Sequence, residues 1–139
     1  MIDISVVASE YSFTHYATLM MDEDKIALID KETKTNVLYA IAIDGKLVYI
    51  GKTNNLRTRI NYYRTSVFRK SKTTDSLKSE RIHNALQNNC TVEIYCRQCF
   101  ELEFQGTMVN TMDLEEPILI NRFNPLWNKH HKRVYKKKS

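Results

Sequence analysis

Apolar residues recur along the chain with a strand period in some segments and with a helical period in others. Val37–Ile43 and Leu47–Ile50 flank Asp44-Gly45, a residue pair that favours a tight β-hairpin turn. Beyond this hairpin, apolar positions from Leu56 recur every three or four residues, which predicts a helix that Asn55 caps. The further expected elements are a helix over 76–87, strands over 91–100 and 107–112, and a helix that begins between 113 and 117 and ends at 122 or 123. This order predicts an α+β fold, in which helices flank a small antiparallel β-sheet.

Residues 1–35 are expected to form an N-terminal β extension of this core. Tyr16–Met21 and Ile26–Ile29 lie on either side of the acidic turn 22–24, which predicts a hairpin. The extension has a net negative charge, which makes it a poor surface for a polyanion. We therefore expect one domain over residues 1–139, with the extension at 1–35, a core at 36–128 that includes a basic loop at 69–75, and a basic tail at 129–139.

The geometry of the Asp44-Gly45 turn decides where Tyr39 and Tyr49 point. A two-residue turn would pair Tyr39 with Ile50 and place the two tyrosines on opposite faces of the sheet. A three-residue turn, with Gly45 in the left-handed conformation, would pair Tyr39 with Tyr49 and place both on one face. Residue propensities barely separate these registers, so the sequence leaves both open.

The composition restricts the class of protein. With 139 residues, of which 42% are hydrophobic and 27% charged, the chain suits one globular domain and not a disordered one. The longest uncharged apolar run, residues 37–43, is too short to span a membrane. The first twenty residues contain no Lys or Arg, so we expect no secretory signal. Three Cys are too few for a disulfide framework, and we expect an intracellular protein.

Basic residues are concentrated in two segments. Residues 46–81 carry ten basic and two acidic side chains, interleaved with aromatic ones, and the tail at 129–139 carries six basic side chains and no acidic one. Such a pattern is typical of surfaces that bind the phosphate backbone of nucleic acids. The candidate backbone contacts are Arg57, Arg64, Arg69, Lys70, Lys72, Lys78 and Arg81. A solvated basic surface is the alternative interpretation.

Asp113, Glu115 and Glu116 form a dense carboxylate cluster near the C-terminus. Carboxylate oxygens suit Mg²⁺, but Asp113 with Glu116 three residues later is also a capping box. Pro117 favours a third arrangement, because Pro prefers the first helical position. Glu116 would then be the cap, and Glu115 would face solvent.

Several short motifs stand in order along the chain. The positions concerned are Val37-Leu38-Tyr39, Tyr49-Ile50-Gly51, Arg59, Glu116, Leu119-Ile120, Pro125 and Asn128. In these residues and their spacing the sequence resembles the GIY-YIG nucleases. The second half of the family's motif is intact, whereas Val37-Leu38-Tyr39 stands where the family usually has Gly-Ile-Tyr. The resemblance implies the GIY-YIG nuclease fold.

The resemblance also implies an activity. It implies a Mg²⁺-dependent endonuclease, with Mn²⁺ as a substitute, that hydrolyses phosphodiester bonds of double-stranded DNA by a single-metal mechanism. The likeness is strongest to phage-encoded members of the family, which implies unmodified, cytosine-containing host DNA as the substrate. It further implies a homotetramer in the cytoplasm of an infected bacterial host cell. The alternatives are a catalytically inactive DNA-binding module, for which the degenerate first motif argues, and a repair or homing nuclease of the same family.

The resemblance assigns roles to individual residues. The implied catalytic residues are Tyr39, Tyr49, Lys52, Arg59, Glu116 and Asn128. Glu116 would hold the metal ion, and Arg59 would stabilise charge on the transferred phosphate. Tyr39 or Tyr49 would orient or deprotonate the attacking water, with Lys52 and Arg59 as the cations beside them. Gly51 would allow another chain segment to approach closely, and Asn128 would fix the local structure or a water.

Overall fold

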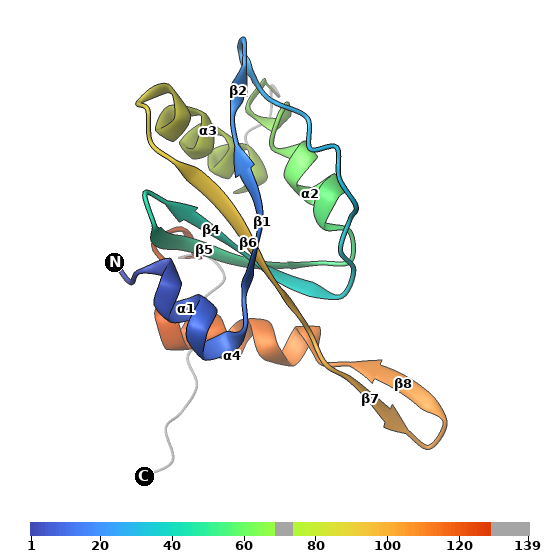
Figure 1. The fold of residues 1–139 in the computed structure, drawn as a ribbon. Coiled ribbons are helices and arrows are strands. Elements are labelled where there is room, and N and C mark those ends of the chain that lie inside the picture. The colour runs from blue at the N-terminus through green and yellow to red at the C-terminus, as the bar shows by residue number, and fades with distance from the viewer. Residues whose placement is uncertain (69–73, 129–139) are drawn as a thin grey trace.

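A four-stranded antiparallel sheet forms the centre of the computed structural model, which describes residues 1–68 and 74–128 (Figure 1). The spatial order of the strands is β1-β6-β4-β5. Their bounds are β1 Thr14–Leu19, β4 Val37–Ile43, β5 Lys46–Thr53 and β6 Val92–Gln98. The α+β fold class that the sequence predicts is therefore observed. The predicted DNA contacts Arg69, Lys70 and Lys72 and the basic tail lie outside the described residues.

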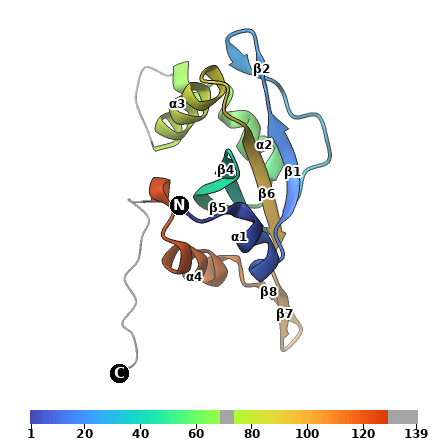
Figure 2. The ribbon, with the colours of Figure 1, turned by 60° about the vertical axis from the view of Figure 1, so that its left-hand side comes forward.

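Helices cover both faces of this sheet (Figure 2). Alternate residues of β4 point to opposite faces, because successive side chains of a strand do so. Val37, Tyr39 and Ile41 pack on the face that bears the helices α2 (Leu56–Tyr62) and α3 (Thr74–Gln87). The intervening residues of β4 pack on the face that bears α1 (Ile4–Tyr11) and α4 (Met112–Phe123). The sheet is thus the middle layer of a three-layer fold.

The N-terminal 35 residues are organised differently from the predicted hairpin. Residues 4–11 form α1, and β1 pairs with β6 as an edge strand of the central sheet. A hairpin remains only in the two short strands β2 (Met21–Asp22) and β3 (Lys25–Ile26). The prediction failed because the partner of β1 lies about eighty positions further along the chain, where no local pattern indicates it.

The Asp44-Gly45 turn has two residues, and yet both tyrosines lie on one face. Ile43 pairs with Lys46, and Asp44 and Gly45 have φ values of 48° and 77°, as a type I′ turn requires. The register then shifts by one residue between Ile41 and Ala42, so that Tyr39 pairs with Gly51. The observed register is therefore neither of the two predicted ones, because a two-residue turn is followed by a one-residue shift. The extra residue in β5 is a β-bulge, which brings Tyr49 to the face of Tyr39.

Helix α2 begins where the sequence predicts. The Asn55 side chain accepts a hydrogen bond from the Thr58 N–H at 3.1 Å, which caps the helix. The helix ends at Tyr62, earlier than the apolar stripe indicates, and a short 3₁₀ helix, η1, follows at Ser66–Phe68. A second 3₁₀ helix, η2, covers Leu126–Asn128 near the end of the described chain.

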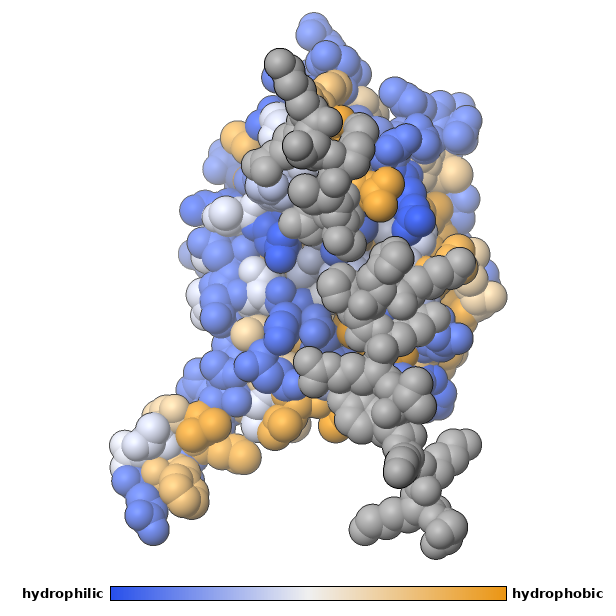
Figure 3. All heavy atoms as spheres, turned by 180° about the vertical axis from the view of Figure 1, so that it is seen from behind, coloured by the Kyte–Doolittle hydropathy of each residue, from blue (hydrophilic) through white to orange (hydrophobic). Residues whose placement is uncertain are grey.

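The strands β7 (Glu101–Phe104) and β8 (Thr107–Asn110) form a ribbon that extends away from the sheet (Figure 1). The predicted turn at Gln105-Gly106 connects them, and both turn residues have positive φ. All eight strand residues are exposed. Figure 3 shows hydrophobic side chains on this ribbon, although exposed ribbons are usually polar.

Helix α4 starts at Met112 and contains Pro117 in its interior. Glu116 is therefore not its cap, and Glu115 is buried instead of facing solvent. Burial is tolerated because the Glu115 carboxylate accepts hydrogen bonds from Arg97, from the Thr111 hydroxyl and from the Phe100 N–H. These bonds tie both ends of the ribbon to α4.

Within residues 1–68 and 74–128, no helix combines the length and the apolar character needed to cross a bilayer.

Candidate active site

Tyr39 and Tyr49 meet over Gly51 on the face of the sheet that bears α2 and α3. Their ring centroids lie 5.8 Å apart, and both side chains are buried. A Cβ atom on Gly51 would lie 2.7 Å from Tyr39 Cζ and 2.7 Å from Tyr49 Cε2. The absence of a side chain at Gly51 therefore allows the two rings to approach each other.

Tyr39 is held as a neutral phenol. Its hydroxyl lies 2.9 Å from that of Tyr63, a buried residue at the end of α2. Burial, the neighbouring Tyr63 and Tyr49, and the hydrogen bond to Tyr63 raise the pKa of Tyr39 well above its ordinary value. The positive charge of Arg59 lowers this pKa but does not offset the other effects. Arg59 therefore lies within electrostatic range of Tyr39, and Tyr39 keeps its proton.

Tyr49 has a cationic partner that the sequence analysis assigned elsewhere. The ammonium group of Lys78, on α3, lies 2.9 Å from the Tyr49 hydroxyl and 4.1 Å from the centroid of its ring. Only 4% of Lys78 is exposed, whereas the prediction placed this residue on the DNA-binding surface. Lys78 thus belongs to the tyrosine cluster, where its ammonium group donates a charge-assisted hydrogen bond to the phenol oxygen.

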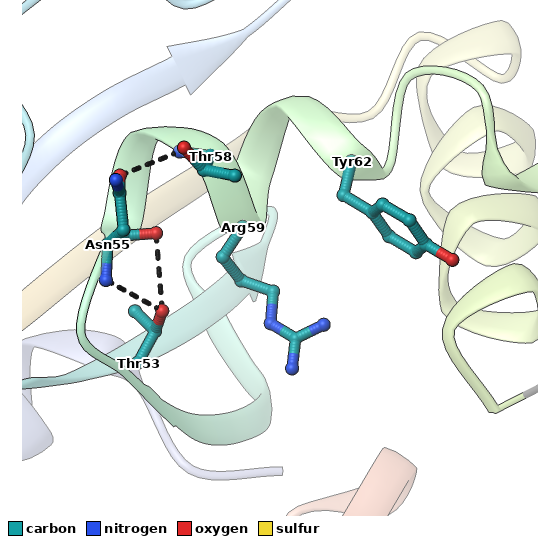
Figure 4. Close-up of a pocket in the computed structure, with 5 residues that line it drawn as sticks. All are labelled: Thr53, Asn55, Thr58, Arg59 and Tyr62. Atoms are coloured by element: carbon teal, nitrogen blue, oxygen red, sulfur yellow. Dashed lines mark hydrogen bonds between the residues drawn. The ribbon is translucent and has the colours of Figure 1, made fainter.

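Arg59 extends from α2 into a pocket (Figure 4). Its side chain lies between those of Thr53 and Tyr62, and the guanidinium group points away from the helix. The helix cap at Asn55 fixes the first turn of α2 and so the direction of Arg59. Arg59 supplies the cationic group among the five residues that line this pocket.

Glu116 lies near the end of β5 that carries Gly51. The ammonium group of Lys52 lies 2.6 Å from an Asp113 carboxylate oxygen, which joins β5 to the first turn of α4. Residues three apart on a helix share a face, so Glu116 lies on the same face of α4 as Asp113. This face is directed toward Lys52. Glu116 is half-buried there. The structure therefore brings Lys52 and Glu116 to the same edge of the sheet.

Asn128 connects the C-terminal segment to β5. Its side chain is fully buried, accepts a hydrogen bond from the Ile50 N–H at 3.0 Å and donates one to the Ile50 carbonyl at 2.8 Å. Ile50 lies between Tyr49 and Gly51, so Asn128 fixes the backbone that carries the motif. Of the two roles expected for Asn128, to fix the local structure or to fix a water, these hydrogen bonds support the first.

The described DNA-contact candidates have different surroundings. Arg57 is exposed on α2, and Arg81 is exposed on α3 with its guanidinium 5.6 Å from the Trp127 ring centroid. Arg64 is half-buried and donates from Nε to the Ile26 carbonyl at 2.7 Å. Arg57 and Arg81 therefore remain the described candidates with accessible side chains.

Comparison with known proteins decides the family. Residues 35–130 match the GIY-YIG catalytic domain. The chain belongs to the GIY-YIG nuclease family. Endonuclease II of Enterobacteria phage T4 is 54% identical over 132 residues, which cover 91% of this chain and 97% of that protein. The predicted family and the endonuclease class are thus confirmed.

Two solved structures support the fold. The structure of a bacteriophage T4 EndoII mutant has a TM-score of 0.84 and 49% sequence identity, and the match covers 91% of this chain and 99% of that chain. A restriction endonuclease in complex with product DNA has a TM-score of 0.52 and 19% identity, over 96% of this chain and 84% of that chain. The second likeness concerns the fold alone.

Two residues of the GIY-YIG site carried no recognisable signal. Tyr63 counted as an apolar helix position in the sequence, although its hydroxyl contacts Tyr39. Lys78 counted as one more basic residue in a basic segment. A phenol buried in a core needs a hydrogen-bond partner, but the sequence does not indicate which residue supplies it.

We expect Gly51→Ala to damage the site and the fold together. The added methyl group would displace both tyrosine rings, which should lower the free energy of unfolding by about 1–3 kcal/mol. Displacement of the hydroxyls by about 1 Å should reduce DNA cleavage by about 100-fold. Urea denaturation and a plasmid cleavage assay measure these effects.

The matched control is Gly45→Asn. A Cβ at Gly45 meets nothing within 4 Å, and Asn tolerates the positive φ of this turn. This variant should keep its cleavage activity. A Gly51→Ala protein as active as the Gly45→Asn control would contradict the close approach seen at Gly51.

Proposed function

We propose that this protein is a metal-dependent endonuclease that hydrolyses phosphodiester bonds of double-stranded DNA. The observation that carries the proposal is the meeting of Tyr39, Tyr49 and Gly51 with the cation Arg59 beside them. These residues occupy the motif positions of a family whose matched domain is catalytic. The similarity to the phage T4 enzyme supports DNA as the substrate.

The tyrosines have different parts in this proposal. Tyr39 keeps its proton and donates or accepts a hydrogen bond as a neutral group, which suits orientation and not proton removal. Tyr49 is the better candidate to contact the attacking water, because the Lys78 ammonium group donates a hydrogen bond to its phenol oxygen and holds it in place. Arg59 stabilises the charge that develops on the phosphate oxygens. We therefore assign the attacking water to Tyr49, a choice that the sequence left open.

Glu116 suits a metal ion that keeps most of its water. Mg²⁺ is usually bound by one or two carboxylates together with waters and substrate phosphates. Glu116, a half-buried carboxylate near the end of β5, meets this requirement. We expect Mn²⁺ to substitute for Mg²⁺, because carboxylate and water ligands suit both ions. When bound, the ion would neutralise charge on the phosphate, and Glu116 would hold it there.

A cleavage assay tests the proposed activity. Supercoiled plasmid should be nicked or cut by the wild-type protein with Mg²⁺ or Mn²⁺, and should stay intact with a chelator. A gel-shift experiment on the same DNA measures binding separately. DNA binding without cleavage under any metal condition would contradict the proposal and support the inactive DNA-binding module.

The phage relative supports a proposal about the substrate and its location. We infer that the protein degrades unmodified host DNA in the cytoplasm of an infected bacterial cell, as the 54% identity to a phage endonuclease suggests. Plasmid DNA with ordinary cytosine should be cut faster than the same DNA with modified cytosine. Equal rates on both would exclude this preference. A repair or homing role would instead require a preferred lesion or site.

The exposed ribbon supports self-association. The exposed apolar residues are Leu102, Phe104, Met108 and Val109 of the ribbon, Phe100 directly before it, and Leu114 and Ile118 of α4, each at least 47% exposed. An apolar surface of this extent is typical of an interface. We propose that second copies of this chain cover it, in the homotetramer that the sequence analysis expects.

Light scattering tests this assembly. The wild-type protein should have the mass of four chains, and Phe104→Glu should reduce it to one or two, because a charge on the ribbon cannot be buried without a partner. Met20→Glu alters an exposed apolar residue outside the ribbon and should leave the mass unchanged. A monomeric wild-type protein would exclude the assembly.

Lys78 and Arg81 form a matched pair on α3. Lys78→Met removes the ammonium group from Tyr49 and should lower kcat for cleavage about tenfold with little change in KM. Arg81→Met removes an exposed charge and should raise KM with little change in kcat. Steady-state kinetics on one plasmid measures both. If Lys78→Met raised KM and left kcat unchanged, Lys78 would contribute to DNA binding, as the sequence analysis predicts, and not to the function of Tyr49.

A further inference from the structure

A second group of polar side chains lies along the face of α2 that carries Arg59. The pocket in Figure 4 has a volume of about 230 Å³ and is lined by Thr53, Asn55, Thr58, Arg59 and Tyr62. Four of these residues recur at helical spacing, so they form one face of α2 and its cap. The tyrosines of the motif, Lys78 and Glu116 do not line this pocket. It therefore extends beyond the group of residues assigned to the reaction.

The groups that this pocket offers to a ligand are mainly hydrogen-bond donors. The Asn55 side-chain oxygen already accepts bonds from the Thr58 N–H and the Thr33 hydroxyl, so only its NH₂ group is left for a ligand. Within residues 1–68 and 74–128, neither that NH₂ group nor the Thr58 hydroxyl has a hydrogen-bond partner. The lining includes a guanidinium group and no carboxylate. Donors beside a fixed positive charge favour an anion.

The size of the pocket restricts this anion. Pockets for drug-sized ligands start at about 300 Å³, so this one suits a group smaller than a whole nucleotide. From residue 55 to residue 62 the helix advances about 10 Å, whereas successive phosphates of one DNA strand advance about 3.4 Å along the duplex axis. The face of α2 is long enough to follow more than one phosphate.

We propose that this pocket binds the DNA backbone phosphate next to the scissile one. Thr58 and the Asn55 NH₂ group donate to it, and Arg59 is shared between the two phosphates. A guanidinium group has five N–H donors in a fork, so it can bind two neighbouring anions. The inference rests on the proposed nuclease function and adds Thr58 as a residue that positions the substrate.

The binding affinity of Thr58 variants tests the proposal. Fluorescence anisotropy with the full chain, in chelator, would measure binding to a duplex of about 20 base pairs in which the wild-type cleavage site has been mapped. Thr58→Val keeps the shape and removes the hydroxyl, so it should bind about tenfold more weakly. Thr58→Glu should bind more weakly still, although an acid in the first turn of a helix is compatible with folding.

The matched control is Thr91→Val. Thr91 is exposed next to the β4–β5 turn, where its N–H donates to Asp44, and it does not line the pocket. This variant should bind as the wild type does. A Thr58→Val protein with the same affinity as Thr91→Val would overturn the proposal.

Neutral phosphate analogues identify the group that is bound. A methylphosphonate on one side of the cleavage site should weaken wild-type binding about tenfold, and Thr58→Val binding by no more than about twofold. Equal losses for both proteins at each flanking position would overturn the inference while leaving the nuclease function intact. If the wild type binds DNA but does not cleave it, the proposed nuclease function is wrong. The pocket can then no longer be assigned to the phosphate next to a scissile one.

Discussion

Glu116→Ala is expected to abolish cleavage while DNA binding persists. The carboxylate is the protein ligand proposed for the metal ion, and loss of a group that stabilises transition-state charge costs about 10²–10³ in rate. Binding should remain, because backbone contacts come from basic residues such as Arg57 and not from an acid. Plasmid cleavage and a gel shift on the same DNA measure the two effects.

The control for this variant is Glu10→Ala. Glu10 pairs with Arg122 at the other end of α4, at 3.3 Å, and both side chains are largely exposed. Such pairs contribute little to stability, and this variant should cleave as the wild type does. Full activity of Glu116→Ala would remove Glu116 from the metal site, and loss of binding would show a different role for this carboxylate.

Glu115→Ala should have the opposite effect, a loss of stability. Glu115 and Arg97 are paired at 2.6 Å with side-chain exposures of 11% and 12%. Removal of one partner from a buried pair leaves the other charge without compensation, which costs about 3–5 kcal/mol. Urea denaturation of the two neighbouring variants should show this loss for Glu115→Ala and about 1 kcal/mol or less for Glu116→Ala. A Glu115→Ala loss below 1 kcal/mol would contradict the buried pair.

The stability that Glu115 contributes should depend on pH. Desolvation raises its pKa, but the hydrogen bonds from Thr111, Arg97 and Phe100 have the larger combined effect and leave the pKa below the ordinary value of 4.5. The folded protein therefore binds this proton less readily than the unfolded chain. The contribution is complete above about pH 4.5 and is lost as the pH falls through the lower folded value. Glu115→Gln should lack this pH-dependent part of the free energy of unfolding.

Local signals in the sequence predicted much of the candidate site. The Asp44-Gly45 turn and the Asn55 cap are fixed by residues within a few positions of each other, so the hairpin and the start of α2 were predicted correctly. These two elements carry Tyr39, Tyr49 and Arg59. The family motifs added Glu116, whose place depends on how α4 packs on the sheet.

Features that depend on distant contacts were not predictable. Helix α3 was predicted over 76–87 and is observed at Thr74–Gln87, but the burial of its polar residues Ser76, Lys78, Ser79 and His83 was not predicted, because it depends on partners elsewhere in the chain. Lys78 can be buried because Tyr49 accepts its hydrogen bond. The sequence places these two residues 29 positions apart.

Helix α1 was not predicted from the sequence for a different reason. Ile4–Tyr11 contains several β-branched residues, which have low helix propensity, although Asp3 caps the helix by accepting a hydrogen bond from the Ser5 N–H at 2.9 Å. Burial of Ile4 and Val7 against α4 and the sheet stabilises a helix that propensity does not favour. Such packing overrides local preference and cannot be read from eight residues alone.

Because β5 contains one extra residue, the number of positions between the two tyrosines decides whether they lie on the same face of the sheet. With a two-residue turn and a regular ladder, residues of β4 and β5 share a face only when an odd number separates their positions. Tyr39 and Tyr49 are ten apart, and the bulge corrects the mismatch. Deletion of Val48 would leave Tyr39 opposite the glycine. Deletion of one strand residue between the two tyrosines that left the bulge in place would instead turn one tyrosine to the far face. Homologous sites can therefore occur with a spacing of nine or ten, and searches for this split motif should allow both.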